Sequence, residues 1–390
     1  MPTSRDASDR SVFAIGWFGQ GNLGDEAMLD GLLALLRRAG GPIKATVTSG
    51  EPAETRTTHG TLAIRLEPWE RFGFRNLDVV RASLGARLVT LGGGDLIREQ
   101  SDGTVPALNW LRRLRVPLRL GRPTAVVGIS VGDLVTPAVI DEVARTLRRV
   151  TFVAARDHAS AVRLSELVGR PVLQIGDLAL ETADELARPR QPDRGQPRIG
   201  LAIRDIIGRG PTAPRSASEH LRVELAAALD AVVDDAAATV ELIPFRTRGP
   251  GWQRDDDARA GEALAALARH GSRWIHHRRP RDVSAFADIA GRLDLILSVR
   301  LHGAVLGAAA GIPVVGIAYD AKVSGFMDDI GLPDQRLPVD ASAGEIRDAV
   351  LRSLADDGLS ARVAAGVGAA RARTREIEPE LRRLLRSSPA

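Results

Sequence analysis

Short apolar runs alternate along the chain with longer stretches in which apolar residues recur at helical spacing. In residues 25–39, for example, Met28, Leu32 and Leu36 fall on one side of a predicted helix. Continuous apolar strands of this kind are typical of a parallel sheet that helices cover on both faces. The first series of strands is predicted at Ser11–Ile15, Ala45–Thr48, Leu62–Leu66, Arg87–Leu91, Thr124–Ile129, Thr151–Ala155 and Val172–Ile175.

A polar segment rich in proline separates this series from a second one. Residues 187–197 contain three prolines and a glycine, which is typical of an interdomain linker. We therefore predict an N-terminal domain over 11–187, a linker over 188–197 and a C-terminal domain over 198–390. The second series has strands predicted at Arg198–Ile203, Thr239–Phe245, Leu293–Ser298 and Pro313–Ile317, and helices near 218–235, 256–270, 302–310, 340–355 and 359–386, the last interrupted near Pro379.

The expected fold class is thus α/β, with two doubly wound Rossmann-like domains. Ligands of such sheets bind at the carboxyl ends of the strands, beside helix N-termini. Two such domains in one chain predict a site in the cleft between them. The length of 390 residues suits two domains, each with its own core.

Composition narrows the class of protein. Cysteine is absent, which excludes disulfides and thiolate metal sites. No apolar run reaches the roughly 18–20 residues of a membrane span, and the N-terminus lacks the apolar stretch of a secretory signal, so we expect a cytoplasmic protein. A net charge of +4 and 4% aromatic residues argue against a nucleic-acid partner.

The first candidate motif is the glycine-rich turn 16–26. Gly19, Gly21 and Gly24 have the spacing Gly-x-Gly-x-x-Gly, but no acidic residue follows the next strand convincingly, so a dinucleotide site is not predicted. Backbone N–H groups at the start of the next helix can bind an anion, with Asn22 beside them. The alternative is a tight turn in which Asp25 or Glu26 caps the helix.

A second glycine motif follows the predicted strand 87–91. Gly92, Gly93 and Gly94 would permit close backbone approach to a ligand or simply a sharp turn. Asp95 would either cap the next helix or hold a sugar hydroxyl.

The strongest candidate chemistry lies at the end of the predicted strand 293–298. Arg300 offers a planar fork for a carboxylate or phosphate, and His302 can move a proton near neutral pH. Both begin a helix, where a cation is unfavourable unless an anion is bound. Tyr319, which is the only tyrosine, and Lys322, one of two lysines, follow the next strand.

The other histidines do not show metal-ligand spacing, and a metal site is therefore not predicted. His276 and His277 lie in an arginine-rich stretch and are expected to be solvated.

Taken in order, several motifs resemble the polysaccharide pyruvyltransferase family. The matching pieces are Gly21–Ala27, Gly92–Gly94, Ala155–Asp157 with Ser160 and Leu164, Gly176-Asp177, Ile203-Arg204, Pro244-Phe245 with Asp255–Asp257, Ser298–His302, and Tyr319–Val323 with Phe326. They extend over residues 13–332. Two departures are Leu178, where the family often has proline, and Asp95 after the glycines.

The resemblance implies the B-type glycosyltransferase fold and transfer of a pyruvyl group from phosphoenolpyruvate to a sugar, with a ketal as product. In that reading Arg204 and Arg300 clamp phosphoenolpyruvate, His302 is the acid and base, and Lys322 stabilises the departing phosphate. No further cofactor is implied. The substrate-binding set, including the acceptor contacts, would be Arg204, Leu301, Gly19, Gly21, Asn22, Gly24, Asp25, Glu26, Gly93, Gly94, Asp95, Arg156 and Tyr319.

The resemblance implies as acceptor a sugar of a cell-surface polysaccharide or of its lipid-linked precursor. The segment 108–120 mixes Trp and Leu with four arginines, and it indicates either a helix packed on the sheet or a peripheral contact with the inner face of the membrane. Two alternatives to pyruvyl transfer stay open at this point: a glycosyltransferase that uses a nucleotide sugar, and a non-catalytic protein that binds a sugar phosphate.

Overall fold

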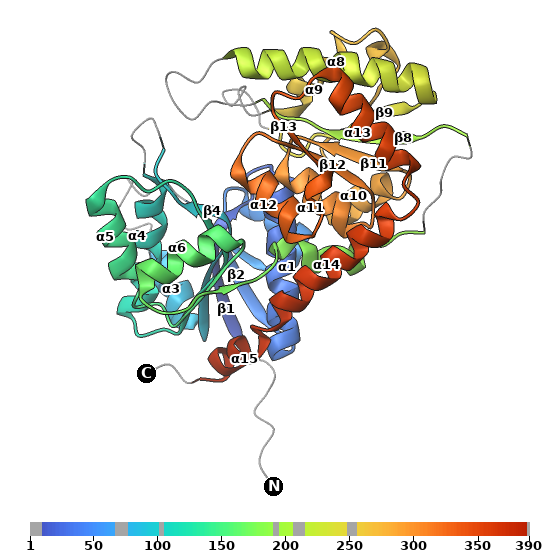
Figure 1. Ribbon diagram of the computed structural model, residues 1–390. Helices are drawn as coiled ribbons and strands as arrows, with labels where there is room; N and C mark the ends of the chain where they lie inside the picture. Colours follow the sequence, from blue (N-terminus) through green and yellow to red (C-terminus); the bar gives the residue numbers. More distant parts are fainter. Residues whose placement is uncertain are drawn as a thin grey trace. The chain divides into compact units, whose positions relative to one another are not determined.

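The computed structural model describes residues 10–66, 77–100, 105–189, 195–205, 215–247 and 256–387. The chain divides into two compact units (Figure 1). Unit 1 comprises Met1–Gln20, Met28–Glu181 and Arg371–Ala390, and unit 2 comprises Gly21–Ala27 and Thr182–Ala370. These units differ from the predicted boundaries in three segments, because 21–27 and 182–187 group with unit 2 and 371–390 with unit 1.

Unit 1 is built on a parallel sheet with the strand order β3-β2-β1-β4-β5-β6-β7. The order reverses between β1 and β4, as in a doubly wound sheet. The strands are β1 (Ser11–Phe18), β2 (Lys44–Ser49), β3 (Leu62–Arg65), β4 (Leu88–Ile97), β5 (Thr124–Val131), β6 (Phe152–Ala155) and β7 (Leu173–Gln174).

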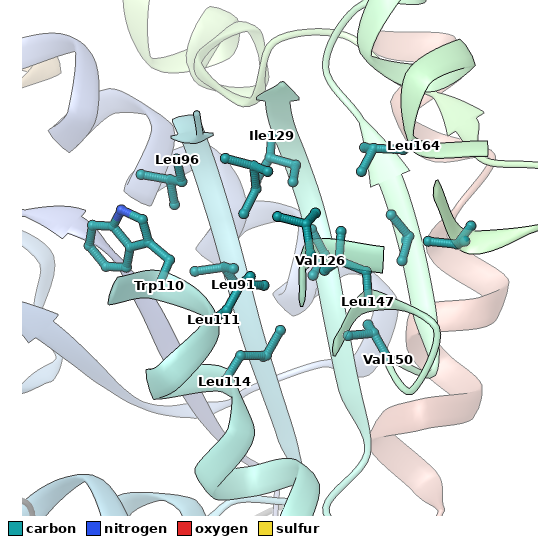
Figure 2. Packing of buried hydrophobic residues seen from close by; sticks show 14 of the residues in the cluster. Leu91, Leu96, Trp110, Leu111, Leu114, Val126, Ile129, Leu147, Val150 and Leu164 are labelled. Atoms are coloured by element: carbon teal, nitrogen blue, oxygen red, sulfur yellow. The ribbon is translucent and has the colours of Figure 1, made fainter. Parts of the chain in front are cut away.

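One face of this sheet carries a core built with helix α4. Its residues Trp110, Leu111 and Leu114 are buried and pack toward Leu91 of β4 and Val126 of β5 (Figure 2). Most of the segment 108–120 lies in α4 (Pro106–Arg119), and the apolar side of this helix belongs to the core. The helices of unit 1 are α1 (Leu23–Gly40, whose first turn lies in unit 2), α2 (Pro52–His59), α3 (Leu77–Gly85), α4 (Pro106–Arg119), α5 (Pro137–Leu147), α6 (His158–Val168) and α15 (Glu378–Arg386).

Unit 2 repeats the architecture with the strand order β10-β9-β8-β11-β12-β13, again all parallel. Its strands are β8 (Arg198–Ala202), β9 (Thr239–Leu242), β10 (Ile275–His276), β11 (Leu295–Ser298), β12 (Val314–Ala318) and β13 (Arg336–Pro338). Its helices are α7 (Ala183–Leu186), α8 (Arg215–Ala236), α9 (Asp257–Ala265), α10 (Val283–Ala290), α11 (Leu301–Ala309), α12 (Ala321–Asp329), α13 (Ala343–Ala355) and α14 (Leu359–Arg375, which ends in unit 1).

The predicted fold class, two doubly wound α/β domains, is confirmed. One local expectation is wrong. Strand β4 runs through the three glycines instead of ending before them: Gly93 and Gly94 adopt φ of 75° and 92°, which glycine tolerates, and the register with β5 shifts after Gly94. Helix α1 begins at Leu23, so Asp25 and Glu26 lie in its first turn and do not cap it.

Among the described residues, no helix is both long enough and apolar enough to cross a membrane.

Candidate active site in the second unit

The strands β8 and β11 end side by side and place two arginines at the same edge of the sheet. Ala202 of β8 pairs in register with Ser298 of β11. Arg204 and Arg300 each follow two residues later. The strand order reverses between these two strands, which is where doubly wound sheets bind ligands.

Arg300 is held by a buried carboxylate. Its Nε donates to Asp257 Oδ1 over 3.0 Å, and its Nη2 donates to the same oxygen. The other oxygen of Asp257 accepts the backbone N–H groups of Phe245 and Arg246, at 3.0 and 2.9 Å. Arg300 is 6% exposed and Asp257 2%. Burial raises the pKa of Asp257, and the charge of Arg300 opposes that rise.

The segment 21–27 is fixed to this part of unit 2 by backbone hydrogen bonds. Leu23 N donates to Phe245 O at 2.9 Å, and Thr247 N donates to Gly21 O at 3.3 Å. Asn22, which stands directly before α1, turns back on the helix: its Nδ2 donates to Asp25 Oδ2 at 2.7 Å. Its Oδ1 accepts the N–H of Gly24 at 3.3 Å. The first turn of α1 is thereby held at the edge of the second sheet.

Gly24 packs directly against the imidazole of His302. A Cβ at position 24 would lie 2.2 Å from His302 Cγ and Nδ1, so only glycine allows this approach. His302 occupies the first turn of α11, which begins at Leu301 with Arg300 at its N-cap. The structure thus brings the glycine-rich turn and the Arg300–His302 motif together, although about 280 residues separate them in the sequence.

The carboxyl group of Asp25 has a raised pKa. Burial raises its pKa from 3.8 to about 7, and the charge of Glu26 adds to the rise. The hydrogen bond from Asn22 and the charges of Arg246 and Arg300 lower the pKa and partly offset that effect. A half-buried carboxyl that titrates near neutral pH, one residue from the glycine that contacts His302, is suited to proton transfer.

Arg204 is oriented by the only tyrosine. Its Nη1 donates to Tyr319 Oη at 2.9 Å, and its Nε donates to Asp205 O at 3.2 Å. Burial raises the pKa of Tyr319, so the phenol is neutral at physiological pH. The N-cap of α12 is Asp320, whose Oδ2 lies 3.9 Å from Lys322 Nζ. Lys322 is therefore tied to the helix start that follows β12.

Five predicted site residues lie in unit 1 and have other neighbours. Gly19 (φ 64°) packs on the loop after β2, while Gly93 and Gly94 face the side chain of Met28. The N-cap of α4 is Val105, so Asp95 does not cap that helix; it lies 3.6 Å from Arg98. Arg156 is 6% exposed and forms an ion pair with Asp177 at 3.4 Å.

Sequence reasoning missed Asp257 and Arg246 as members of the site. Residues 244–245 and 255–257 matched the family pattern, but the spacing alone does not show that Asp257 meets Arg300, 43 residues away.

The expectation that His277 is solvated was wrong: its Nε2 lies 2.5 Å from Glu241, whose side chain is inaccessible to solvent. Within the described ranges, no three His, Cys, Asp or Glu side chains are grouped so that they could hold a metal ion.

Comparison with known proteins gives a family and a fold. The sequence pattern of the polysaccharide pyruvyl transferase family matches residues 22–321. No curated protein sequence matches the chain.

Several solved structures share the fold at low sequence identity. A glycosyltransferase from Rickettsia africae has a TM-score of 0.62 at 12% identity, with 97% of this chain and 99% of that chain covered. The UDP-GlcNAc 2-epimerase of Neisseria meningitidis, bound to UDP-GlcNAc, has a TM-score of 0.57 at 11% identity, with coverage of 95% and 99%. Anabaena HepE in complex with UDP-glucose has a TM-score of 0.55 at 13% identity, with coverage of 96% and 98%. The fold is that of the B-type glycosyltransferases and epimerases, as the family resemblance implied.

Proposed function

Because this chain belongs to the polysaccharide pyruvyl transferase family, we propose that it moves the pyruvyl group of phosphoenolpyruvate onto a sugar of a cell-surface polysaccharide or of its lipid-linked precursor. The product is a cyclic ketal. The observation that carries this proposal is the placement of Arg204 and Arg300 at the reversal point of the second sheet, with His302 beside them in the first turn of α11.

The proposed donor site is strongly cationic. Phosphoenolpyruvate carries a carboxylate and a phosphate, and Arg204, Arg246 and Arg300 surround Asp257 and Asp25 in this part of unit 2. The N-terminus of α11 adds its own partial positive charge. Arg300 uses Nε and Nη2 for Asp257, so a clamp through those two nitrogens does not fit. In the proposal, Arg300 contributes its positive charge.

The proposed reaction needs three proton movements, which we assign to His302 and Asp25. A proton adds to the methylene carbon of phosphoenolpyruvate, and a sugar hydroxyl bonds to the neighbouring carbon as its own proton leaves. The C–O bond to phosphate then breaks, and phosphate departs with its electron pair. A second hydroxyl attacks the same carbon, loses its proton and closes the ketal. His302 is proposed as the first acid, Asp25 as its partner for the hydroxyl protons, and Lys322 as the cation for the leaving phosphate.

The test is a product assay with the purified protein. The protein is incubated with phosphoenolpyruvate and a panel of glycan acceptors, free and lipid-linked, and both phosphate release and the mass of the acceptor are measured. The proposal expects phosphate release that depends on the acceptor, with one pyruvyl ketal gained for each phosphate. Phosphate release without a change in acceptor mass would contradict it.

The second candidate is glycosyl transfer from a nucleotide sugar, since proteins of this fold are described in complex with UDP-GlcNAc and UDP-glucose. The same acceptor panel with UDP-sugars in place of phosphoenolpyruvate separates the two. Turnover with UDP-sugars alone would replace pyruvyl transfer as the proposed function. Binding of sugar phosphates without turnover of either donor would indicate a non-catalytic protein.

A further inference from the structure

Helices α4 and α5 enclose a small hollow on unit 1, which we name the α4–α5 pocket. Its volume is about 200 Å³. Its walls are four arginines, one carboxylate and one hydroxyl: Arg115, Arg119, Glu142, Arg145, Thr146 and Arg149. All six residues belong to unit 1, and none is part of the proposed active site in unit 2.

The position of the arginines follows from the packing of the two helices. The apolar side of α4 is buried on the sheet through Leu111 and Leu114, and α5 is buried through Leu147 (Figure 2). Val143 of α5 belongs to the same core. The polar sides of both helices consequently turn away from the core, and their arginines line one space. The helices lie next to each other (Figure 1).

A single carboxylate holds two of the arginines in place. Glu142 pairs with Arg115, and its Oε2 lies 2.7 Å from Arg145 Nη1. Thr146, which is buried, donates its hydroxyl proton to Glu142 Oε1 at 3.0 Å. Glu142 is itself mostly buried, with 18% of its side chain exposed. Glu142 thus fixes the guanidinium groups of Arg115 and Arg145 at the wall of the pocket. One carboxylate cannot neutralise the charge of all four arginines.

The pocket carries an excess of positive charge that opposes folding. Four arginines face one glutamate, and Arg115 and Arg119 of α4 are a like-charged pair at i,i+4 spacing, which destabilises a helix. Burial lowers the pKa of Arg115, and the charges of Arg119, Arg112, Arg145 and Arg149 lower it further. A bound anion would relieve this repulsion.

We propose that the α4–α5 pocket binds a phosphoryl group, from a soluble phosphate or from the headgroup of an anionic lipid. The volume is below the roughly 300–1,000 Å³ of pockets for drug-sized molecules, so the ligand group is small. Guanidinium forks match the oxygens of phosphate, and an excess of three positive charges suits a multiply charged anion better than a single carboxylate.

The experiment compares two charge-matched double variants. Arg119→Gln/Arg149→Gln removes two pocket arginines but leaves the Glu142 bonds to Arg115 and Arg145 intact. Arg81→Gln/Arg163→Gln removes two exposed arginines elsewhere in unit 1. Pyrophosphate binding is measured by titration calorimetry, and co-sedimentation is measured with phosphatidylcholine vesicles that contain or lack phosphatidic acid. Thermal melts confirm that both variants are folded.

The expected result is that the wild type and the Arg81/Arg163 variant bind a phosphoryl ligand, and that the pocket variant binds it about tenfold or more weakly. Retained binding of pyrophosphate without vesicle binding assigns the site to soluble phosphates. Binding confined to phosphatidic acid vesicles assigns it to a lipid headgroup. An equal loss of affinity in both variants would mean that only the general positive charge of the protein matters, which would overturn the proposal. Unchanged binding by the pocket variant would also overturn it, as would the absence of binding by the wild type.

Discussion

At the level of single residues, the contact between Gly24 and His302 joins the glycine-rich turn to the Arg300–His302 motif. The imidazole lies where a side chain at position 24 would otherwise be. Asn22 and Asp25 are fixed beside it by their own hydrogen bond. Gly24 is therefore needed because it leaves room for the imidazole of His302, and not only because the backbone turns there.

If His302 is the acid, replacing it with alanine removes proton transfer without disturbing the core. We expect His302→Ala to lower turnover on the order of 10²–10⁴-fold, the usual contribution of general acid–base catalysis, with little change in melting temperature. Coupled detection of released phosphate measures this. His158→Ala, which removes an exposed imidazole from α6, is the control and should keep the wild-type rate. A His302→Ala variant with near wild-type turnover would contradict the role.

Asp25 predicts a dependence of stability on pH. Its pKa is raised from 3.8 to about 7 in the folded protein, so the folded state holds the proton after the unfolded chain has released it. This contribution to stability is full below the unfolded pKa and is lost as pH rises toward about 7. The free energy of unfolding of Asp25→Asn, relative to wild type, should therefore increase with pH across that window and be constant above it. Urea unfolding at several pH values measures the difference, and a constant difference throughout would contradict the raised pKa.

At the scale of elements, one carboxylate connects three parts of the second unit. Asp257 begins α9, bonds to Arg300 at the start of α11, and accepts the backbone N–H groups that follow β9. The parallel strands bring these ends to one edge. The ion pair between the buried Asp257 and Arg300 fixes the helix starts there.

Asp257→Asn should be strongly destabilising, because the amide places a donor against Arg300 and leaves that cation buried without its counter-charge. Breaking a buried pair in this way costs about 3–5 kcal/mol. Denaturant unfolding measures the loss. The matched variant Glu262→Gln, at an exposed position of the same helix, should stay within about 0.5 kcal/mol of wild type. A similarly small change in Asp257→Asn would show that the pair does not support the fold.

The sequence predicted the elements whose pattern is local. Apolar runs identified β5 and β11, and Arg300 was found because it follows a predicted strand at the start of a helix, whereas Arg204 was predicted only through the family resemblance. The two-residue strand β10 is exposed and lies at the edge of its sheet, so it carries no such pattern. The partners of Arg300 and His302 depend on tertiary contacts between distant segments, which periodicity does not reveal.

At the scale of the whole molecule, residues 371–390 belong to unit 1, together with the segments before residue 182 that form its sheet. Leu381, Leu384 and Leu385 of α15 are buried, Arg382 donates to the carbonyl of Ala39 at 2.9 Å, and Thr374 accepts the N–H of Gly176 at 3.0 Å. The last helix thus completes unit 1.

Ending the chain at Ala370 should therefore weaken unit 1 and not unit 2. Exposure of three buried leucines costs on the order of 5 kcal/mol at about 1.5–3 kcal/mol for each side chain. Hydrogen exchange should then be faster in β1 and β4 but unchanged in β8 and β11. A uniform increase in exchange across both sheets, or none, would contradict the assignment of 371–390 to unit 1.

The seven residues 21–27 have a consequence for how such a protein can change during evolution. They lie about 160 residues before the segment 188–197 in the sequence, yet they hydrogen-bond to the same part of unit 2 that carries Arg300 and His302. A recombination event with one breakpoint in 188–197 would replace the half of the chain that contains His302 but keep residues 21–27. The new histidine would then face a segment 21–27 from a different protein. Exchange of a single gene segment would thus not transfer this site intact. We therefore expect new specificities to arise by point substitution instead.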